Sequence, residues 1–340
     1  MDISKIFKKQ LIHEPLIIAE ISCNHNGSKT KFLKLIKSAC KNGADLIKIQ
    51  SYEPEDMLID QKFTIKKGLW KNKKLWNLYK KTHTPFDWHS EAFRLAKRYN
   101  KIIFSSPFSI RGVDLLEKLN CRIYKIASFE ITDYKLIKYI ASKKKPIIIS
   151  TGIASFKEIN NAIQIIEKFH SKIIILHCVS SYPTKLENIN LARINTLKEK
   201  FPNFPIGISD HTNNIYSAIA ATTYDVIAIE KHLKLNNKDK TMDASFSITP
   251  SQLIELKNST RKIFLSKYKI KPISDQKNIF LRRSVFAIKK IKKNEKLTKN
   301  NIDTLRPNIG ICASKYFKIL NKKSKRTIKV GEPIFRKDIR

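Results

Sequence analysis

The chain has 340 residues, of which 42% are hydrophobic, so it can bury one large or two modest cores, and no apolar run approaches the ~20 residues that cross a bilayer. Its formal net charge is +38, yet the 67 lysines and arginines are spread along the chain without a nucleic-acid-binding motif, which indicates solvated helix faces rather than DNA or RNA binding. Five scattered cysteines and a start without an apolar export signal argue against a disulfide framework and predict a cytoplasmic protein.

Short apolar runs, separated by stretches long enough for a helix, fill the first three quarters of the chain. They are Pro15–Ile21, Leu46–Gln50, Ile102–Ser106, Ile123–Ile126, Ile147–Ser150, Ile173–His177, Pro205–Ser209 and Val226–Glu230. Strands that are buried on both faces read as continuous β-branched runs, and helices between them imply a parallel sheet. Eight such units predict an α/β fold, a (β/α)8 TIM barrel, whose active site lies at the carboxyl ends of the strands.

Two regions fall outside this repeating pattern. Residues 51–84 are longer than an ordinary connection from strand to helix and contain Trp70, Trp76 and Tyr79, so they are a candidate cover of the site. The end of the chain changes to short strand-like runs and turns. The predicted organisation is a barrel domain, a linker and a small β-rich domain, at residues 1–268, 269–280 and 281–340.

Histidines follow two neighbouring strands of the predicted barrel. His211 comes after the seventh strand and His232 after the eighth, so their imidazoles could meet at the carboxyl edge. Two imidazoles suit a divalent transition metal that keeps positions open for water or substrate. Two hydrogen-bonded barrel histidines explain the pattern equally well, and His25 and His177 occupy similar positions, so the residues alone do not choose among the four.

Two lysines, Lys48 and Lys125, lie within predicted buried strands. An unpaired ammonium is costly there, so each needs an anionic partner. That partner is either a carboxylate, Glu20 or Glu130, or a phosphate or carboxylate of a substrate, which the net positive charge of the chain would attract. Hydroxyl groups on the same rim favour the anion site, and they are Ser106, Ser128, Ser150 and Thr151.

Three carboxylates are candidates for proton transfer near this rim: Glu20, Glu130 and Asp243. We expect one of them to act as general acid or base and the others to orient a lysine. Helix caps or salt bridges explain the same residues without catalysis, and the position of Asp243 in a polar loop would not by itself attract notice.

Several of these segments, in this order, resemble motifs of the sialic acid synthase family. The matching stretches are Ile17–Gly27, Gly43–Gln50, Ser105–Phe108, Tyr124–Ser128, Ile149–Gly152, Ser209–Thr212 and Ile229–His232. The last stretch, Arg283–Ile339, is similar to the antifreeze-like (SAF, β-clip) domain that ends these enzymes. Within the family the chain looks most like the pseudaminic acid synthase branch, on the segments Leu75–Tyr79, Thr84–His89 and Lys125–Asp133.

The resemblance implies a transferase reaction. Phosphoenolpyruvate condenses with the open-chain aldehyde of an acetamido sugar, which in this branch is 2,4-diacetamido-2,4,6-trideoxy-β-L-altropyranose, and phosphate leaves by C–O cleavage. An N-acetylneuraminate or legionaminate synthase would perform the same chemistry on another acetamido sugar. A barrel aldolase with Lys125 as Schiff-base lysine, and a non-catalytic sugar- or nucleic-acid-binding protein, are the remaining alternatives.

The resemblance also implies roles for single residues. His211 and His232 match the ligands of a divalent metal, Mn²⁺ or else Mg²⁺ or Co²⁺. The positions that hold phosphoenolpyruvate are matched by Lys48, Lys125, Ser106, Ser128 and Ser150. Glu20 matches a carboxylate that orients water or moves a proton, and Glu130 matches the carboxylate beside the anion pocket.

The sugar site takes its residues from two chains in this family. Gln50, Tyr182 and Asp243 match positions that line it within the barrel. Arg306 matches the arginine that reaches the N-acetyl group of the sugar from the partner subunit's small domain. The resemblance therefore implies a domain-swapped homodimer.

Overall fold

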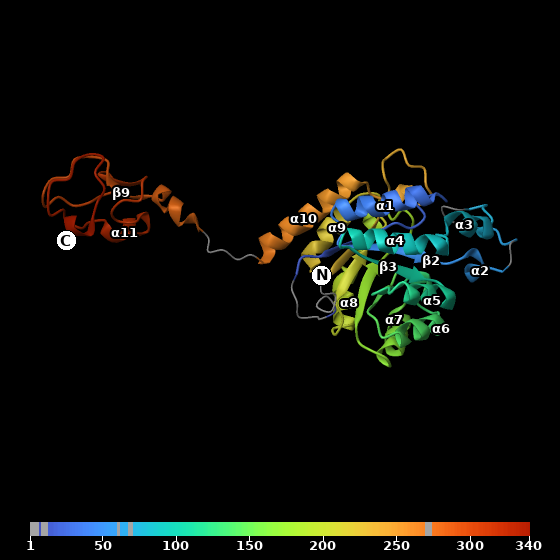
Figure 1. The fold of residues 1–340 in the computed structure, drawn as a ribbon. Coiled ribbons are helices and arrows are strands. Elements are labelled where there is room, and N and C mark those ends of the chain that lie inside the picture. Colours follow the sequence, from blue (N-terminus) through green and yellow to red (C-terminus); the bar gives the residue numbers. More distant parts are fainter. Residues whose placement is uncertain (1–6, 8–12, 60–61, 67–70, 269–273) are drawn as a thin grey trace. The chain divides into compact units, whose positions relative to one another are not determined.

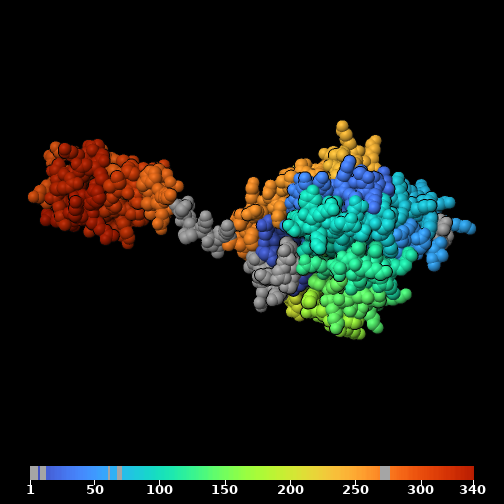
Figure 2. Space-filling model, viewed as in Figure 1, coloured from blue at the N-terminus to red at the C-terminus, as the bar shows by residue number. Residues whose placement is uncertain are grey.

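The computed structural model describes residues 7, 13–59, 62–66, 71–268 and 274–340, and the chain divides into two compact units, Met1–Lys269 and Ile270–Arg340 (Figure 1). Each unit has its own hydrophobic core, and each is a closely filled body in the space-filling view (Figure 2). No helix within these ranges is both long enough and apolar enough to cross a bilayer.

The first unit is a closed barrel of eight parallel strands, in which each strand pairs with the next and the last pairs with the first. The strands are β1 (Leu16–Glu20), β2 (Leu46–Ser51), β3 (Ile102–Pro107), β4 (Tyr124–Ile126), β5 (Ile147–Ser150), β6 (Ile173–Cys178), β7 (Ile206–Ser209) and β8 (Ala228–His232). Only Gln50 and Ile102 among these strand residues are partly exposed. Burial on both faces explains the continuous apolar runs, and the predicted (β/α)8 barrel is confirmed.

Helices cover the outside of the barrel (Figure 1). They are α1 (Lys29–Lys41), α4 (Phe86–Arg98), α5 (Ile110–Lys118), α6 (Tyr134–Ser142), α7 (Phe156–Glu167), α8 (Arg193–Lys200), α9 (Tyr216–Ala221) and α10 (Pro250–Tyr268), whereas α2 (Pro54–Met57) and α3 (Leu75–Thr82) belong to the connection from β2 to α4. Helix α7 shows how the sequence builds them. Its Ile159, Ile163 and Ile166 recur at helical spacing and are buried, and the Ser155 hydroxyl caps the first turn by accepting from the Glu158 backbone N–H at 3.2 Å.

The long connection from β2 to α4 carries the two short helices α2 and α3. Between them the chain turns back on itself at an isolated antiparallel bridge between Thr64 and Lys74. Trp76 and Tyr79 lie on α3, whereas Trp70 lies outside the described residues. The segment that the sequence marks as a candidate cover is therefore a folded insertion at the carboxyl end of β2.

The second unit is built on a two-stranded antiparallel sheet of β9 (Ser284–Ala287) and β10 (Ile302–Leu305), with one short helix, α11 (Tyr316–Ile319). A 3₁₀-helix at Ser274–Leu281 precedes the sheet and occupies the later part of the predicted linker. The core consists mainly of isoleucine, leucine and valine side chains from residues 285 to 339. Isolated β-bridges, rather than further strands, connect the rest of this small fold.

Candidate active site

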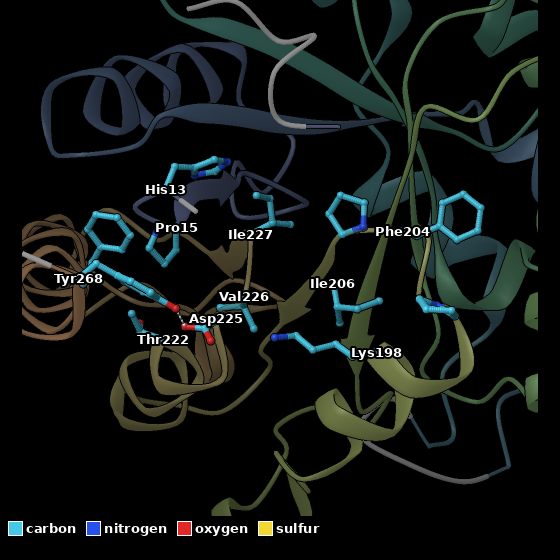
Figure 3. Close-up of a pocket in the computed structure, with 13 residues that line it drawn as sticks. His13, Pro15, Lys198, Phe204, Ile206, Thr222, Asp225, Val226, Ile227 and Tyr268 are labelled. Atoms are coloured by element: carbon cyan, nitrogen blue, oxygen red, sulfur yellow. Dashed lines mark hydrogen bonds between the residues drawn. The ribbon is translucent and has the colours of Figure 1, made fainter. Parts of the chain in front are cut away.

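One cavity of about 320 Å³ lies at the amino ends of β7 and β8 (Figure 3). Ile206 and Ile227 form part of its wall, and its charged groups already have partners. The Asp225 carboxylate pairs with Lys267, and the Lys198 ammonium donates to the Tyr224 carbonyl. The amino end of a TIM barrel contributes stability, not chemistry, so this cavity is not our candidate for the active site.

A second cavity, of about 400 Å³, lies at the carboxyl ends of the strands. Its polar lining comes from around the whole barrel and includes Ser22, Lys48, Gln50, Lys125, Ser128, Glu130, Ser150, Tyr182, Ser209, His211, Glu230, His232 and Asp243. Ten of these residues belong to the set that the sequence predicted: all except Ser22, Ser209 and Glu230. The fold thus brings together groups that are up to 221 residues apart in the chain, as Ser22 and Asp243 are.

Three predicted site residues do not line this cavity. Glu20 lies directly beneath it, because its carboxylate contacts the Lys48 ammonium at 2.9 Å and accepts from the Gln50 amide at 3.2 Å. Ser106 is buried, and its hydroxyl finds no hydrogen-bond partner in the described part of the chain. Arg306 belongs to the second unit, where it is exposed at the end of β10.

A network of buried charges forms the floor of the cavity. The Lys48 ammonium lies 2.9 Å from the Glu20 carboxylate and 3.3 Å from that of Glu230. Burial lowers the pKa of Lys48, but the two carboxylates outweigh burial and raise it above its ordinary value. Burial raises the pKa of Glu230, but Lys48 and Lys125 outweigh burial and hold it at about 2, whereas the pKa of Glu20 is raised by burial. Lys48 therefore stays charged across the physiological range.

Lys125 differs from Lys48 because its bonding partners are neutral. Its ammonium donates to the Ser150 hydroxyl at 2.5 Å and to the Ile126 carbonyl at 3.1 Å, and no described carboxylate lies within ion-pair distance. Burial lowers the pKa of Lys125 to about 8, so the ammonium form predominates at neutral pH. A buried ammonium without a counter-ion, beside hydroxyl donors, is a site for an anion.

The two predicted histidines meet on the opposite side of the cavity. The ring centroids of His211 and His232 are 5.3 Å apart. The Nδ1 atom of His211 lies 3.1 Å from the Val179 carbonyl, and that of His232 lies 3.3 Å from the Asp243 carboxylate. Burial, reinforced by His232, lowers the pKa of His211 to about 3, so this imidazole is neutral at physiological pH.

These features fit a divalent metal bound by the pair. A neutral imidazole whose Nδ1 faces a carbonyl or carboxylate leaves Nε2 for a metal, and this is the arrangement of metal-binding histidines in general. No hydrogen bond of either Nε2 occurs within the described ranges. Those ranges contain no group of three His, Cys, Asp or Glu side chains spaced to hold a metal. Within the described residues, His211 and His232 could therefore supply two ligands to a metal whose other positions are filled by substrate and water.

The other two histidines are structural in this fold. His25 packs edge-on against Phe32 and Trp88, and its Nε2 lies 3.2 Å from the Thr84 hydroxyl. His177 points its Nε2 at the Ile189 carbonyl at 2.7 Å. Neither side chain lines the cavity. The structure therefore separates the four histidines that the sequence pattern left equivalent.

Two further groups shape the cavity near these charges. Burial raises the pKa of the Glu130 carboxyl to about 7, although Lys125 opposes the shift, and one Glu130 oxygen has no hydrogen-bond partner among the described residues. A carboxyl with a pKa near 7 is suited to general acid or base catalysis. The ring of Tyr182 packs on His211, with centroids 4.6 Å apart, and closes the histidine side of the cavity.

Glu230 is the main site residue that the sequence reasoning missed. Side chains alternate between the two faces of a strand, so Glu230 and His232 point to the inside of the barrel while Lys231 points outward. Lys231 instead forms a buried pair with Asp210 at 3.5 Å, outside the cavity. Counting two residues back from His232 would have found Glu230, and counting back from His211 would have found Ser209.

Comparisons with known proteins agree with this geometry. The NeuB family matches residues 35–271, and the SAF domain matches residues 282–340. A pseudaminic acid synthase of Helicobacter pylori is 40% identical over 97% of this chain and 99% of that protein. An N,N′-diacetyllegionaminic acid synthase of Campylobacter jejuni is 35% identical over 94% of this chain and 98% of that protein. A crystal structure of N-acetylneuraminic acid synthetase from Leptospira borgpetersenii superposes with a TM-score of 0.70, at 32% identity over 78% of this chain and 90% of that one. The chain therefore belongs to the NeuB family and ends in a SAF domain.

Proposed function

We propose that this protein condenses phosphoenolpyruvate with 2,4-diacetamido-2,4,6-trideoxy-altrose to form pseudaminic acid and phosphate. The observation that carries the proposal is one cavity that combines the buried ammonium of Lys125, which has no carboxylate within ion-pair distance, with the histidine pair His211 and His232. The first group suits the anionic phosphoenolpyruvate, and the second suits a metal that acts on an aldehyde. The 40% identity to a pseudaminic acid synthase over almost the whole chain supports this sugar over the related ones.

We assign substrate binding and proton transfer to different residues of the cavity. Lys48, Lys125, Ser128 and Ser150 hold phosphoenolpyruvate on the cavity floor, so that its C3 faces the sugar aldehyde. C3 forms a bond to the aldehyde carbon, the aldehyde oxygen takes a proton, and water adds at C2. The C2–O bond then breaks, and phosphate leaves with the bridging oxygen. Glu130 has a pKa suited to exchanging one of these protons at neutral pH, and Glu20 is the other carboxyl at the floor.

Metal dependence is general in the NeuB family. We propose that His211 and His232 hold the ion and that it is Mn²⁺, or else Mg²⁺ or Co²⁺. When bound, it would supply Lewis-acid polarisation of the aldehyde oxygen. Asp243 and the Val179 carbonyl would fix the two imidazoles through Nδ1.

The proposal is tested by phosphate release. The protein is incubated with Mn²⁺, phosphoenolpyruvate and, separately, the altro-configured diacetamido sugar, the sugar precursor of N,N′-diacetyllegionaminic acid, or N-acetylmannosamine. We expect turnover with the first sugar at the highest kcat/KM. Phosphoenolpyruvate labelled with ¹⁸O at the bridging oxygen should deliver the label to phosphate. Absence of turnover with all three sugars would overturn the proposed function, and label in the keto acid would overturn C–O cleavage.

We expect the kcat/KM for phosphoenolpyruvate to fall above pH 8. The Lys125 pKa of about 8 makes this side chain a cation below that pH and a neutral amine above it, and only the cation attracts the anionic substrate. Lys48 stays charged over the same range, so it adds no inflection. The measurement is the pH profile of kcat/KM, which reports groups of the free enzyme. In Lys125→Arg the charge persists, so a retained inflection near pH 8 would contradict the assignment.

We propose further that the active form is a homodimer in which Arg306 completes the partner's sugar site. Arg306 is exposed in the second unit and forms no salt bridge within the described residues, and no arginine lines the described part of the cavity. Exposed apolar side chains next to it, Phe280, Leu305 and Ile309, suit a protein interface. Both observations support an exchange of small domains between two subunits.

Mixing two inactive variants tests this exchange. Chains carrying Lys125→Ala and chains carrying Arg306→Ala should recover about a quarter of wild-type activity after random re-assortment, because half the dimers are mixed and half of their sites are intact. Phosphate release and native mass spectrometry of the mixture measure recovery and heterodimer formation. Verified heterodimers without recovery would show that Arg306 acts within its own subunit or not at all.

A further inference from the structure

The candidate active site has a second, apolar side that the proposed chemistry does not use. Six apolar side chains line it: Met57, Ile65, Leu75, Leu78, Phe108 and Phe129. The hydroxyl-bearing side chains beside them are Tyr79 and the pair Tyr52 and Thr82, whose hydroxyls bond to each other at 2.8 Å. We call these six residues the apolar wall. Four of them come from the insertion between β2 and α4, and Phe108 and Phe129 follow β3 and β4.

The insertion holds the apolar wall in place through its own backbone bonds. The Ile65 N–H donates to the Lys73 carbonyl at 3.0 Å, and the Leu75 N–H donates to the Phe63 carbonyl at 2.9 Å. Ile65 and Leu75 are thereby fixed on paired stretches of chain at the edge of the cavity. Below them the Tyr52 ring packs edge-on against Phe108 at 5.3 Å. These contacts hold Ile65, Leu75 and Phe108 at the cavity in the structure without a ligand.

The apolar wall and the two lysines lie at different depths along the barrel axis, so they contact different parts of a ligand. Lys48 and Lys125 lie within strands and form the floor, whereas Ile65 and Leu75 lie on the insertion beyond the strand ends. The sugar aldehyde has to approach phosphoenolpyruvate at the floor for the new bond to form. The far end of the open-chain sugar, from C4 to C6, would then lie along the apolar wall.

We infer that the apolar wall selects sugars that carry methyl groups at this far end, namely a second acetamido group and a 6-deoxy carbon. This inference rests on the proposed function. A hydroxyl placed against side chains that neither donate nor accept loses its hydrogen bonds to water without replacement. A methyl group in the same place fills the space, and the removal of its apolar surface from water favours binding. The wall therefore favours a diacetamido-trideoxy sugar over a hexose with one acetamido group and a C6 hydroxyl.

The test compares two sugars in variants that make the wall polar. Ile65→Asn and Leu75→Asn place an amide on the wall. Phe129→Gln does the same at a side chain that is 58% exposed and thus has little part in folding. The matched control is Ile59→Asn, which changes a side chain in the same insertion that is 93% exposed and does not line the cavity. Purified full-length proteins are assayed with the diacetamido-trideoxy sugar and with N-acetylmannosamine, and melting temperatures confirm folding.

In the wall variants we expect kcat/KM for the diacetamido sugar to fall about 10- to 100-fold, as a lost methyl contact does in an apolar pocket. The preference for this sugar, measured as its kcat/KM divided by that for N-acetylmannosamine, should fall by a similar factor. The KM for phosphoenolpyruvate should stay within about twofold of wild type, and the control variant should match wild type in all three values. An unchanged ratio in all folded wall variants, while wild type turns over the diacetamido sugar, overturns the inference alone. Failure of wild type to turn over the diacetamido sugar overturns the proposed function instead.

Discussion

Replacing His211 by alanine should lower turnover by about a thousandfold or more. A metal that polarises a carbonyl contributes several kcal/mol to transition-state stabilisation, and each ~1.4 kcal/mol is a factor of ten in rate. His211 is one of only two imidazoles in the described lining of the cavity, so a pair reduced to His232 alone has too few ligands to keep the ion. Chelation of the wild-type protein should have the same effect, and Mn²⁺, Co²⁺ or Mg²⁺ should reverse it.

Binding of Mn²⁺, measured by calorimetry in the absence of substrate, separates loss of the metal from other damage. We expect His211→Ala to bind Mn²⁺ at least about tenfold more weakly than wild type. The control is His170→Ala, which removes an imidazole that lies after α7 and outside the cavity, and it should bind and turn over normally. Full activity after exhaustive chelation would remove the metal from the mechanism.

Two buried lysines should respond in opposite ways to replacement by methionine. Lys125→Met should lower kcat/KM for phosphoenolpyruvate by about 10² to 10³, the usual effect of deleting one partner of a buried charge contact. Its stability should be unchanged or higher at pH 7, because the buried ammonium has no carboxylate partner. The pKa of Lys125 lies below its ordinary value of 10.5, so burial of the cation opposes folding below pH 8, and this cost disappears as pH rises from about 8 to 10.5. The gain of the variant should disappear over the same range.

Lys231→Met is the matched control. Lys231 is as deeply buried as Lys125, but it pairs with Asp210 and donates to the Thr212 carbonyl at 2.7 Å, outside the cavity. Its removal leaves a buried carboxylate without its cation, which costs about 3 kcal/mol or more. We expect a lower denaturation midpoint for Lys231→Met and a near-normal KM for phosphoenolpyruvate in the molecules that remain folded. Equal loss of substrate affinity in both variants would contradict an anion site at Lys125.

The alternation of side chains along a strand decides which residues reach the cavity. Lys48 and Gln50, or Glu230 and His232, lie two residues apart on one strand, and both members of each pair line the cavity. Lys231 lies between two cavity residues in the sequence, but its side chain faces away from the cavity and pairs with Asp210. Ser106 stands two residues before Phe108, yet it is buried below the cavity, because depth along the strand matters as well as this alternation.

Sequence alone was sufficient to predict the barrel. A strand that is covered on both faces is apolar along its length, and eight such runs with helices between them are typical of a (β/α)8 barrel. The sequence was sufficient as well for most of the polar site, because parallel strands bring their carboxyl ends to one edge. The pattern of strand ends did not distinguish His211 and His232 from His25 and His177, since all four follow strands. The family resemblance singled out the first pair, and packing shows that of the four only these two rings reach the cavity. Nor did the sequence reveal the apolar wall: Ile65 and Leu75 belong to an insertion without periodicity, and only the tertiary fold turns that insertion back over the end of the barrel.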